Sequence, residues 1–336
     1  MRVSVSLVTY NGRHWLDLCL ASLLAQTHPD LEIVALDNGS TDGTAGYLAD
    51  FAARHPGFRL LLEPANLGFA GGHNRVIAQT SGALVCLLNQ DVILDPSFLA
   101  EAVAGFTGSS TVGAVQGRVY RMTPERQKTE ILDTTGLEMH RNRRVVSRGQ
   151  GKGVSELLDQ PGEVFGADGP CPAYRRSALE DVACPGRLGR EYLDEDFFAY
   201  KEDVDLAWRL RLAGWDAVYV PSAIAWHGRG AAEPSQGGLR RYIRHRRAMA
   251  AWLRRTSWRN HRLMLVKNES PALFFRDIIP IAWREVRSAA FIAAVHPADL
   301  IAIGGFVRLI PRMLRKRRHL RTRRRVSDAH FSVWLR

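Results

Sequence analysis

Six carboxylates lie within twelve consecutive positions, between residues 194 and 205, in a chain whose formal net charge is +12. One explanation is structural, because acidic side chains are favoured in the first turn of a helix, where the N-terminus carries partial positive charge. The other explanation is chemical: some of these acids could face a cation and a substrate hydroxyl, as a general base does. The six residues are Asp194, Glu195, Asp196, Glu202, Asp203 and Asp205.

A second group of polar side chains follows the strands expected in the first hundred residues. Strand-like and helix-like segments alternate there, which predicts an α/β fold with a mainly parallel sheet covered by helices on both faces. Ligands bind beyond the carboxyl ends of the strands in such sheets. The expected strands are 3–10, 31–40, 58–64 and 82–91, and the expected helices are 14–26, 40–55 and 71–80. The polar strand ends are Thr9, Tyr10, Asn11, Asp37, Asn38, Asn66, Asn89 and Asp91.

The glycine-rich stretch ANLGFAGGHN, residues 65–74, leads into one of these helices. It has neither the glycine spacing of the dinucleotide fingerprint nor the lysine of a Walker A loop, so a redox or NTPase function loses its main support. Free backbone N–H groups at such a turn could still approach a diphosphate closely.

An apolar strand then delivers Asp91 to the sheet edge, two residues after Asn89. One or two carboxylates suffice for Mg²⁺ when a substrate diphosphate supplies further oxygens. The structural alternative for Asp91 is an Asx turn between strand and helix.

Charge is distributed unevenly along the chain. Residues 237–336 contain 24 lysines and arginines against 5 acids, a net charge of +19, whereas residues 1–236 carry −7. Such asymmetry indicates a polyanionic partner, either nucleic acid or an anionic membrane surface. The acidic body and the lack of a recognisable nucleic-acid motif count against nucleic acid. The Trp, Phe and Ile residues between the arginines favour lipid.

Residues 237–336 are predicted to form a mainly helical, amphipathic extension. Residues 288–307 contain one acid, but His296, Pro297, Asp299 and two glycines interrupt them, which disfavours a membrane-spanning helix. We expect helices that lie in the plane of a membrane interface, and helices that pack on the body or on a second subunit are the alternative. Because the candidate chemistry lies before residue 230, removal of residues 271–336 is expected to leave slow activity.

Three further features concern the class of protein. A hydrophobic content of 46% and a charged content of 24% indicate an ordinary globular chain. The first ten residues have the pattern of a strand and not of a secretory signal, and the widely spaced cysteines suggest reduced thiols, so a cytoplasmic protein is expected. Residues 117–166 have few long apolar runs and are predicted to be a loop-rich excursion.

Seven motifs follow one another along the chain: SLVTYN, LDNGSTDGT, NLGFAGGHN, LLNQD, YRRSALEDV, YKEDVDLAWRLRLAGW and YVPSAIAWHGRG. In type and order they resemble the motifs of family 2 glycosyltransferases with the GT-A fold. They resemble most the bacterial rhamnosyltransferase-like branch that uses dTDP-L-rhamnose. The resemblance implies a catalytic domain over residues 1–236 and a membrane-associating extension over 237–336.

The resemblance also implies a reaction and a place for it. An inverting transferase would move a sugar onto a lipid-linked saccharide at the cytoplasmic face of the cell membrane, during synthesis of a cell-surface polysaccharide. A UDP-sugar or GDP-sugar is the alternative donor within the family, and a catalytically inactive scaffold is disfavoured because the base, metal and nucleotide positions are all filled.

Roles at the donor site follow from the same resemblance. Thr9, Tyr10 and Asp37 would hold the nucleotide base and ribose. Asn89 and Asp91 occupy the family's D-x-D positions, and because Asn89 replaces the first acid, Asp91 would need the donor diphosphate to hold Mg²⁺ or Mn²⁺. The other positions implied are Asn66, Gly71 and Asn74 along the donor and His227 near the metal or diphosphate.

The resemblance assigns the acidic cluster as well. Glu202 and Asp203 match the family's E-D pair, in which Asp203 would take the proton of the acceptor hydroxyl. Glu202 would orient the acceptor or nearby cations, whereas Asp205 and the acids at 194–196 are expected to be structural.

Overall fold

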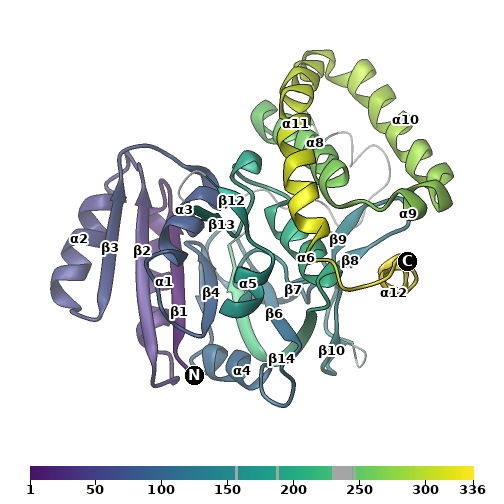
Figure 1. The fold of residues 1–336 in the computed structure, drawn as a ribbon. Helices are drawn as coiled ribbons and strands as arrows, with labels where there is room; N and C mark the ends of the chain where they lie inside the picture. Colours follow the sequence, from purple (N-terminus) through teal and green to yellow (C-terminus); the bar gives the residue numbers. More distant parts are fainter. Residues whose placement is uncertain (156–157, 187–188, 229–243, 245–246) are drawn as a thin grey trace.

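The structure is a computed structural model that describes the whole chain except residues 156–157, 187–188, 229–243 and 245–246 (Figure 1). Its central sheet has the strand order β10-β14-β6-β11-β4-β1-β2-β3. The strands are β1 (Val3–Thr9), β2 (Leu31–Asn38), β3 (Phe58–Glu63), β4 (Leu84–Asn89), β5 (Val92–Leu94), β6 (Val112–Met122), β7 (Lys128–Thr134), β8 (Leu137–Met139), β9 (Val145–Ser147), β10 (Gly162–Glu163), β11 (Ala173–Arg175), β12 (Cys184–Gly186), β13 (Gly189–Glu191) and β14 (Asp216–His227).

Four of these strands, β3, β2, β1 and β4, run parallel to one another, as the alternating pattern predicts. β11 is inserted antiparallel between β4 and β6, and β14 runs parallel to β6. The α-helices are α1 (Arg13–Leu24), α2 (Thr44–Arg54), α3 (Gly68–Ile77), α4 (Phe98–Ala104), α5 (Arg176–Asp181), α6 (Glu202–Leu212), α8 (Ala251–Asn268), α9 (Pro271–Arg276), α10 (Ile278–Val295), α11 (Ala302–Arg321) and α12 (Asp328–Phe331).

The side chains of β4 show how the sheet is covered on both faces. Cys86 and Leu88 lie in the core cluster that includes residues of α1, α2 and α4. Val85 and Leu87 lie in the cluster that includes residues of α3, α5 and α6. Successive side chains of a strand point to opposite faces, so the continuous apolar run of β4 is that of a strand buried on both sides.

The prediction of a loop-rich excursion over residues 117–166 was wrong in part. β6 continues to Met122, and β7, β8 and β9 follow within this region. Leu132 and Met139, in β7 and β8, are fully buried. These strands are short, and β7 begins with exposed charged residues, so their apolar pattern is too brief to stand out in the sequence.

The C-terminal extension is helical where the structure describes it, as predicted, and its helices stand together beside the sheet (Figure 1). The alternative of packing on the body holds for α8 and α11. Leu263 of α8 and Met313 of α11 share a buried cluster with Phe197 and with Trp208 of α6. The expected domain boundary between residues 236 and 237 lies outside the described residues.

Two further expectations can be compared with the described residues. None of their helices combines the length and the apolar character needed to cross a bilayer. The four cysteines are free thiols and all are buried; they are Cys19, Cys86, Cys171 and Cys184.

Candidate active site

The register of the parallel strands brings the predicted donor residues to one edge of the sheet. Thr9 lies opposite Asp37 across β1 and β2. Val8 lies opposite Asn89 across β1 and β4. Strand ends far apart in the sequence therefore meet, as expected at the carboxyl edge of a parallel sheet.

Asp37 is buried and Tyr10 is exposed at this edge of the sheet. The Asp37 carboxylate accepts the backbone N–H of Ser40 through Oδ2 at 3.1 Å, while its buried Oδ1 meets no donor among the described residues. The Tyr10 side chain is exposed. An unpartnered buried carboxylate oxygen is costly, and a donor N–H group of a ligand would satisfy it.

Thr9 and Asn11 are tied into the loops beyond the strands. The Thr9 hydroxyl donates to the carbonyl of Leu36 at 3.2 Å. Asn11 has a left-handed backbone (φ 48°), and its Oδ1 accepts the N–H of Thr41 at 2.8 Å. Asn11 therefore supports the turn after β1, a conformation in which Asn is among the favoured non-glycine residues.

Asn38 and Asn66 hold the glycine-rich turn in shape. The Asn38 side chain donates to Asn66 Oδ1 and to the Gly68 carbonyl, each at 3.1 Å, and accepts the Leu67 N–H at 2.8 Å. Asn66 Oδ1 also accepts the Gly68 N–H at 2.8 Å. A Cβ on Gly71 would lie 2.9 Å from the Leu67 side chain, so close packing requires glycine there.

Asn74 faces the acidic segment more than the strand ends. Its Nδ2 donates to the Leu193 carbonyl at 2.8 Å and to Glu195 Oε1 at 3.1 Å. Its Oδ1 accepts the N–H groups of Tyr192 and Leu193 at 3.1 and 2.9 Å. Asn74 thereby fastens α3 to the segment that leads toward α6.

Asp91 and His227 meet at the end of the central strands. His227 Nε2 lies 3.3 Å from Asp91 Oδ2, and its Nδ1 lies 2.8 Å from Asp133 Oδ2. Burial lowers the pKa of His227, but the charges and hydrogen bonds of Asp91 and Asp133 raise it to about 10. Burial likewise opposes ionisation of Asp91, yet the His227 charge and hydrogen bond leave the pKa of Asp91 below its usual value. Asp133, which orients the ring, carried no signal in the sequence.

A divalent cation fits this place only with help from a ligand. The described residues contain no group of three or more metal-ligating side chains. Asp91 offers a carboxylate beside the His227 ring, and the nearby Asn89 Oδ1 is buried with no donor among the described residues. Carboxylate and amide oxygens are suitable ligands, His227 would have to lose its proton before its nitrogen could bind, and diphosphate oxygens would have to complete the coordination.

The residues just before α6, within the acidic segment, have an unusual backbone conformation. Phe198, Tyr200 and Lys201 have φ angles of 65°, 70° and 76°, which is rare for residues with side chains and strained for bulky ones. The buried Asn260 of α8 stabilises this segment by donating to the carbonyls of residues 197, 199 and 200 at 2.8 to 2.9 Å. Asn260 therefore links the extension to the start of α6, a role the sequence did not indicate.

The same segment touches the glycine-rich turn. The Ala70 N–H donates to the Phe198 carbonyl at 3.2 Å. Gly68 has a φ of 76°, and a Cβ there would lie 2.4 Å from that carbonyl oxygen. Only glycine combines this conformation with so close an approach.

Asp203 is partly buried beside a second carboxyl, that of the buried Asp168. Burial, the charge of Asp168 and a hydrogen bond with its carboxyl raise the pKa of Asp203 to about 6. Burial and the charge of Asp203 raise the pKa of Glu202 to about 8. Two adjacent buried carboxylates cannot both ionise easily, so one proton is shared at such sites. The sequence analysis missed Asp168, whose only signal was an acid between glycines in GADGP.

A short segment connects this base candidate with the strand ends. The Pro170 carbonyl accepts the Asn89 N–H at 3.0 Å. A Cβ on Gly169 would lie 3.6 Å from Asp203 Oδ2. Asp168 is oriented by its own N–H, which donates to Gln116 Oε1 at 2.7 Å. The segment 168–170 therefore lies between Asn89 and Asp203.

Three other acids of the cluster, Asp194, Asp196 and Asp205, are bound by buried cations of the extension, as expected of structural residues. Lys267 of α8 pairs with Asp194 and with Asp205, the latter at 2.8 Å. Lys316 of α11 pairs with Asp194 and with Asp196. The cluster therefore has separate parts. Asp203 faces Asp168, Asp194, Asp196 and Asp205 face the extension, and Glu195 faces Asn74.

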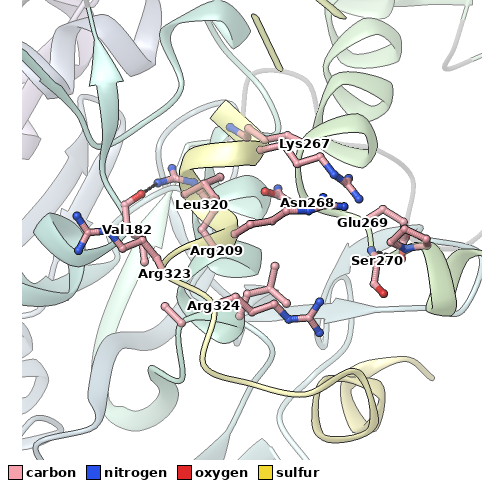
Figure 2. Close-up of a pocket in the computed structure, with 14 residues that line it drawn as sticks. Val182, Arg209, Lys267, Asn268, Glu269, Ser270, Leu320, Arg323 and Arg324 are labelled. Carbon is pink, nitrogen blue, oxygen red and sulfur yellow. Dashed lines mark hydrogen bonds between the residues drawn. The ribbon is translucent and has the colours of Figure 1, made fainter. Parts of the chain in front are cut away.

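A separate pocket lies where the ends of α6, α8 and α11 converge (Figure 2). Arg209 and Lys267, which contribute to its wall, both pair with Asp205. None of the residues predicted to bind donor or metal, and neither Glu202 nor Asp203, lines this pocket. It is therefore distinct from the candidate active site.

Comparison with known proteins decides the family. The model of "Glycosyl transferase family 2" matches residues 4–183, more than half of the chain. This chain belongs to glycosyl transferase family 2. The residues matched include the strand ends, the glycine-rich turn and Asp91, and the architecture is that of the GT-A glycosyltransferases.

This family 2 glycosyltransferase has rhamnosyltransferase-like relatives. It is 33% identical over 241 residues to the N-acetylglucosaminyl-diphospho-decaprenol L-rhamnosyltransferase of Mycobacterium tuberculosis. This alignment covers 66% of this chain and 74% of the relative. It is 27% identical over 226 residues to the poly-beta-1,6-N-acetyl-D-glucosamine synthase of Staphylococcus epidermidis, covering 67% of this chain and 49% of that enzyme.

Two solved structures resemble this glycosyltransferase in fold. A mannosyltransferase from Pyrobaculum calidifontis, in complex with GDP-Man and Mn²⁺, superposes with a TM-score of 0.53 at 20% identity, covering 96% of this chain and 85% of that one. S. aureus TarS 1–349, in complex with UDP, superposes with a TM-score of 0.55 at 16% identity, covering 96% and 87%. At these identities the likeness concerns the fold alone.

Proposed function

We propose that this family 2 glycosyltransferase moves L-rhamnose from dTDP-L-rhamnose onto a lipid-linked saccharide, with inversion at the anomeric carbon. The observation that carries the transfer is Asp203, a partly buried carboxyl whose pKa is raised to about 6, and the L-rhamnosyltransferase relative supports the sugar. The segment 168–170 separates Asp203 from the strand ends that bear Asn89 and Asp91. A base with a pKa near the working pH, beside a nucleotide-sugar site, suits transfer to a hydroxyl.

The reaction is a single displacement. The oxygen of the acceptor hydroxyl attacks the anomeric carbon and forms the new glycosidic bond, while its proton passes to Asp203. The bond between the anomeric carbon and the diphosphate oxygen breaks, and the nucleoside diphosphate leaves with the electron pair. Attack opposite to the leaving group inverts the anomeric configuration.

Asp168 and Glu202 support Asp203 in this scheme. Asp168 keeps the pKa of Asp203 raised, so that the base accepts a proton more readily than an ordinary aspartate would. With its own pKa raised to about 8, Glu202 is protonated at neutral pH and can donate a hydrogen bond to the acceptor.

At the donor, Tyr10 and the free Oδ1 of Asp37 would hold the base and ribose. Asp91, the donor diphosphate and, once its proton is displaced, His227 would hold Mg²⁺ or Mn²⁺, and the buried Asn89 Oδ1 lies close by. Such a cation would neutralise the charge that develops on the leaving diphosphate. Asn38, Asn66 and Asn74 would act through the turn and segment they hold.

The acceptor and the location rest on the relatives. The mycobacterial relative is named for a decaprenol-linked diphosphate saccharide, which supports a lipid-linked acceptor here. We place the enzyme at the cytoplasmic face of the cell membrane, in the synthesis of a cell-surface polysaccharide.

A donor panel tests the proposed function. Purified protein is incubated with Mg²⁺, a lipid-linked saccharide and dTDP-L-rhamnose, UDP-sugars or GDP-sugars, and the nucleoside diphosphate released is measured. Release of dTDP with a rhamnosylated product of inverted configuration is expected. Transfer from a UDP-sugar or GDP-sugar alone would assign the other donor class, and release without a transferred sugar would contradict the proposal.

A further inference from the structure

The outward side of α10 is apolar along its length. Ile279, Trp283 and Val286 are 79%, 63% and 60% exposed. Their spacing of four and three residues places them on one side of the helix. A surface helix of a globular protein normally turns its apolar side inward. α10 does bury Ile281 and Ile292, but it leaves this second apolar side in water. The exposed alanines of α10 are Ala282, Ala289, Ala290, Ala293 and Ala294.

Exposed apolar residues continue beyond both ends of α10. Phe275 of α9 is 69% exposed, and Ile301, in the 3₁₀ turn Pro297–Ile301, is 71% exposed. We call Phe275, Ile279, Trp283 and Val286 the apolar face. Figure 1 shows α10 at the outer edge of the extension, away from the sheet. Contiguous exposed apolar surface of this kind marks an interaction site.

The acids of the extension are all neutralised within the protein. Asp277 and Glu269 pair with the buried Arg143. Asp299 pairs with Arg254 and Arg255. The remaining pairs are Glu285 with Arg262 and Arg284, and Asp328 with Arg324. No acid of residues 237–336 is therefore left to repel an anionic surface.

Arginines remain on the outside. Arg287 of α10 and Arg308 of α11 are exposed, and neither makes a hydrogen bond or ion pair with any residue in the described ranges. Arg287 directly follows Val286 and therefore lies at the edge of the apolar side of α10. An apolar side edged by an unpaired cation matches the interface of an anionic bilayer, where apolar groups insert below phosphate headgroups.

We propose that the apolar face of α9 and α10 inserts into the interface of an anionic lipid bilayer, with Arg287 against the lipid phosphates. This inference rests on the proposed function in one respect: the proposed acceptor is embedded in a membrane. It also revises the expectation for the whole basic extension, since α8 and α11 bury cations against the body and the lipid contact belongs chiefly to α9 and α10.

Vesicle sedimentation of the full-length protein tests this proposal. Wild type is compared with an Ile279→Ser/Trp283→Ser variant on vesicles of phosphatidylcholine with and without phosphatidylglycerol. The matched control is Leu62→Ser/Ile131→Ser, because Leu62 and Ile131 are 60% and 47% exposed on other elements. We expect the face variant to lose at least about tenfold in vesicle affinity, since each large apolar side chain left in water forfeits its insertion. The control should bind like wild type.

Two conditions refine this result. High salt should release wild type only in part, because salt screens the arginines but not the apolar contact. Transfer to a soluble acceptor should be equal in wild type and the face variant, so failure of the proposed function would be seen separately from failure of membrane binding.

Several outcomes would overturn the inference. Equal vesicle binding by wild type and the face variant would do so, as would an equal loss in the control. A concentration-dependent dimer that the face variant abolishes, without vesicle binding, would assign the face to a second copy. Binding of duplex DNA in preference to vesicles would assign the extension to nucleic acid.

Discussion

At the scale of the residue, Asp168 is expected to control the pH at which Asp203 acts as a base. Asp203 must be ionised to accept a proton, so the rate should rise with pH through the pKa of about 6. Asp168→Asn removes the neighbouring negative charge and lowers the pKa of Asp203. The acid limb of the pH profile of kcat should therefore move down by about one unit.

The control for this profile is Asp181→Asn, whose carboxylate pairs with Arg325 at the surface. Its acid limb should coincide with that of wild type. If Asp168 had a merely structural role, Asp168→Asn would lower the maximal rate without moving the acid limb of the profile. That result would show that Asp168 does not control the pKa of Asp203.

Asp91 carries a second prediction at this scale. Calorimetry should show that Mg²⁺ strengthens dTDP binding to wild type and that Asp91→Ala weakens Mg²⁺-dependent dTDP binding at least about tenfold. Thymidine, which has no diphosphate, should bind both proteins equally. Undiminished Mg²⁺-dependent dTDP binding in the variant would show that the cation lies elsewhere.

At the scale of the element, the extension holds the acidic segment through buried lysines. Lys267 lies between Asp194 and Asp205 and is fully buried. Lys267→Met should lower the free energy of unfolding by about 3 kcal/mol, because Asp194 and Asp205 each lose one of two buried cations and keep only Lys316 and Arg209. Arg75→Met, which breaks a partly exposed pair with Glu63, should cost about 1 kcal/mol or less. Urea unfolding measures both, and equal losses would contradict this account of the lysine.

The elements also show what the sequence could predict. The alternation of strand-like and helix-like apolar segments predicted the parallel strands. The polar residues at the strand ends could be predicted as well, because the chain turns out of the sheet there. The pairing of Asp168 with Asp203 and of Asp133 with His227 could not be predicted, because it depends on an antiparallel insertion and on short strands that bring distant segments together. The left-handed residues before α6 escaped notice for the same reason: Asn260, far along the chain, stabilises them.

At the scale of the whole molecule, the basic extension is part of the core. Phe331 of α12 stacks on Trp208 of α6 with ring centroids 5.8 Å apart and an interplanar angle of 12°. Deleting residues 271–336 would remove this contact and the Lys316 ion pairs. We therefore expect truncation to give an unfolded or aggregated protein, contrary to the expectation from sequence that slow activity survives. Circular dichroism of the truncated chain checks this, and a cooperative melt with retained transfer would contradict it.

The central claim is that Asp203 takes the proton in an inverting sugar transfer. The most direct measurement is the turnover of Asp203→Asn with the donor that wild type uses, together with donor affinity in the same preparation. The account predicts a fall in turnover of about 10²–10⁴-fold with nearly unchanged donor affinity, as for loss of a general base. Turnover near that of wild type would contradict it.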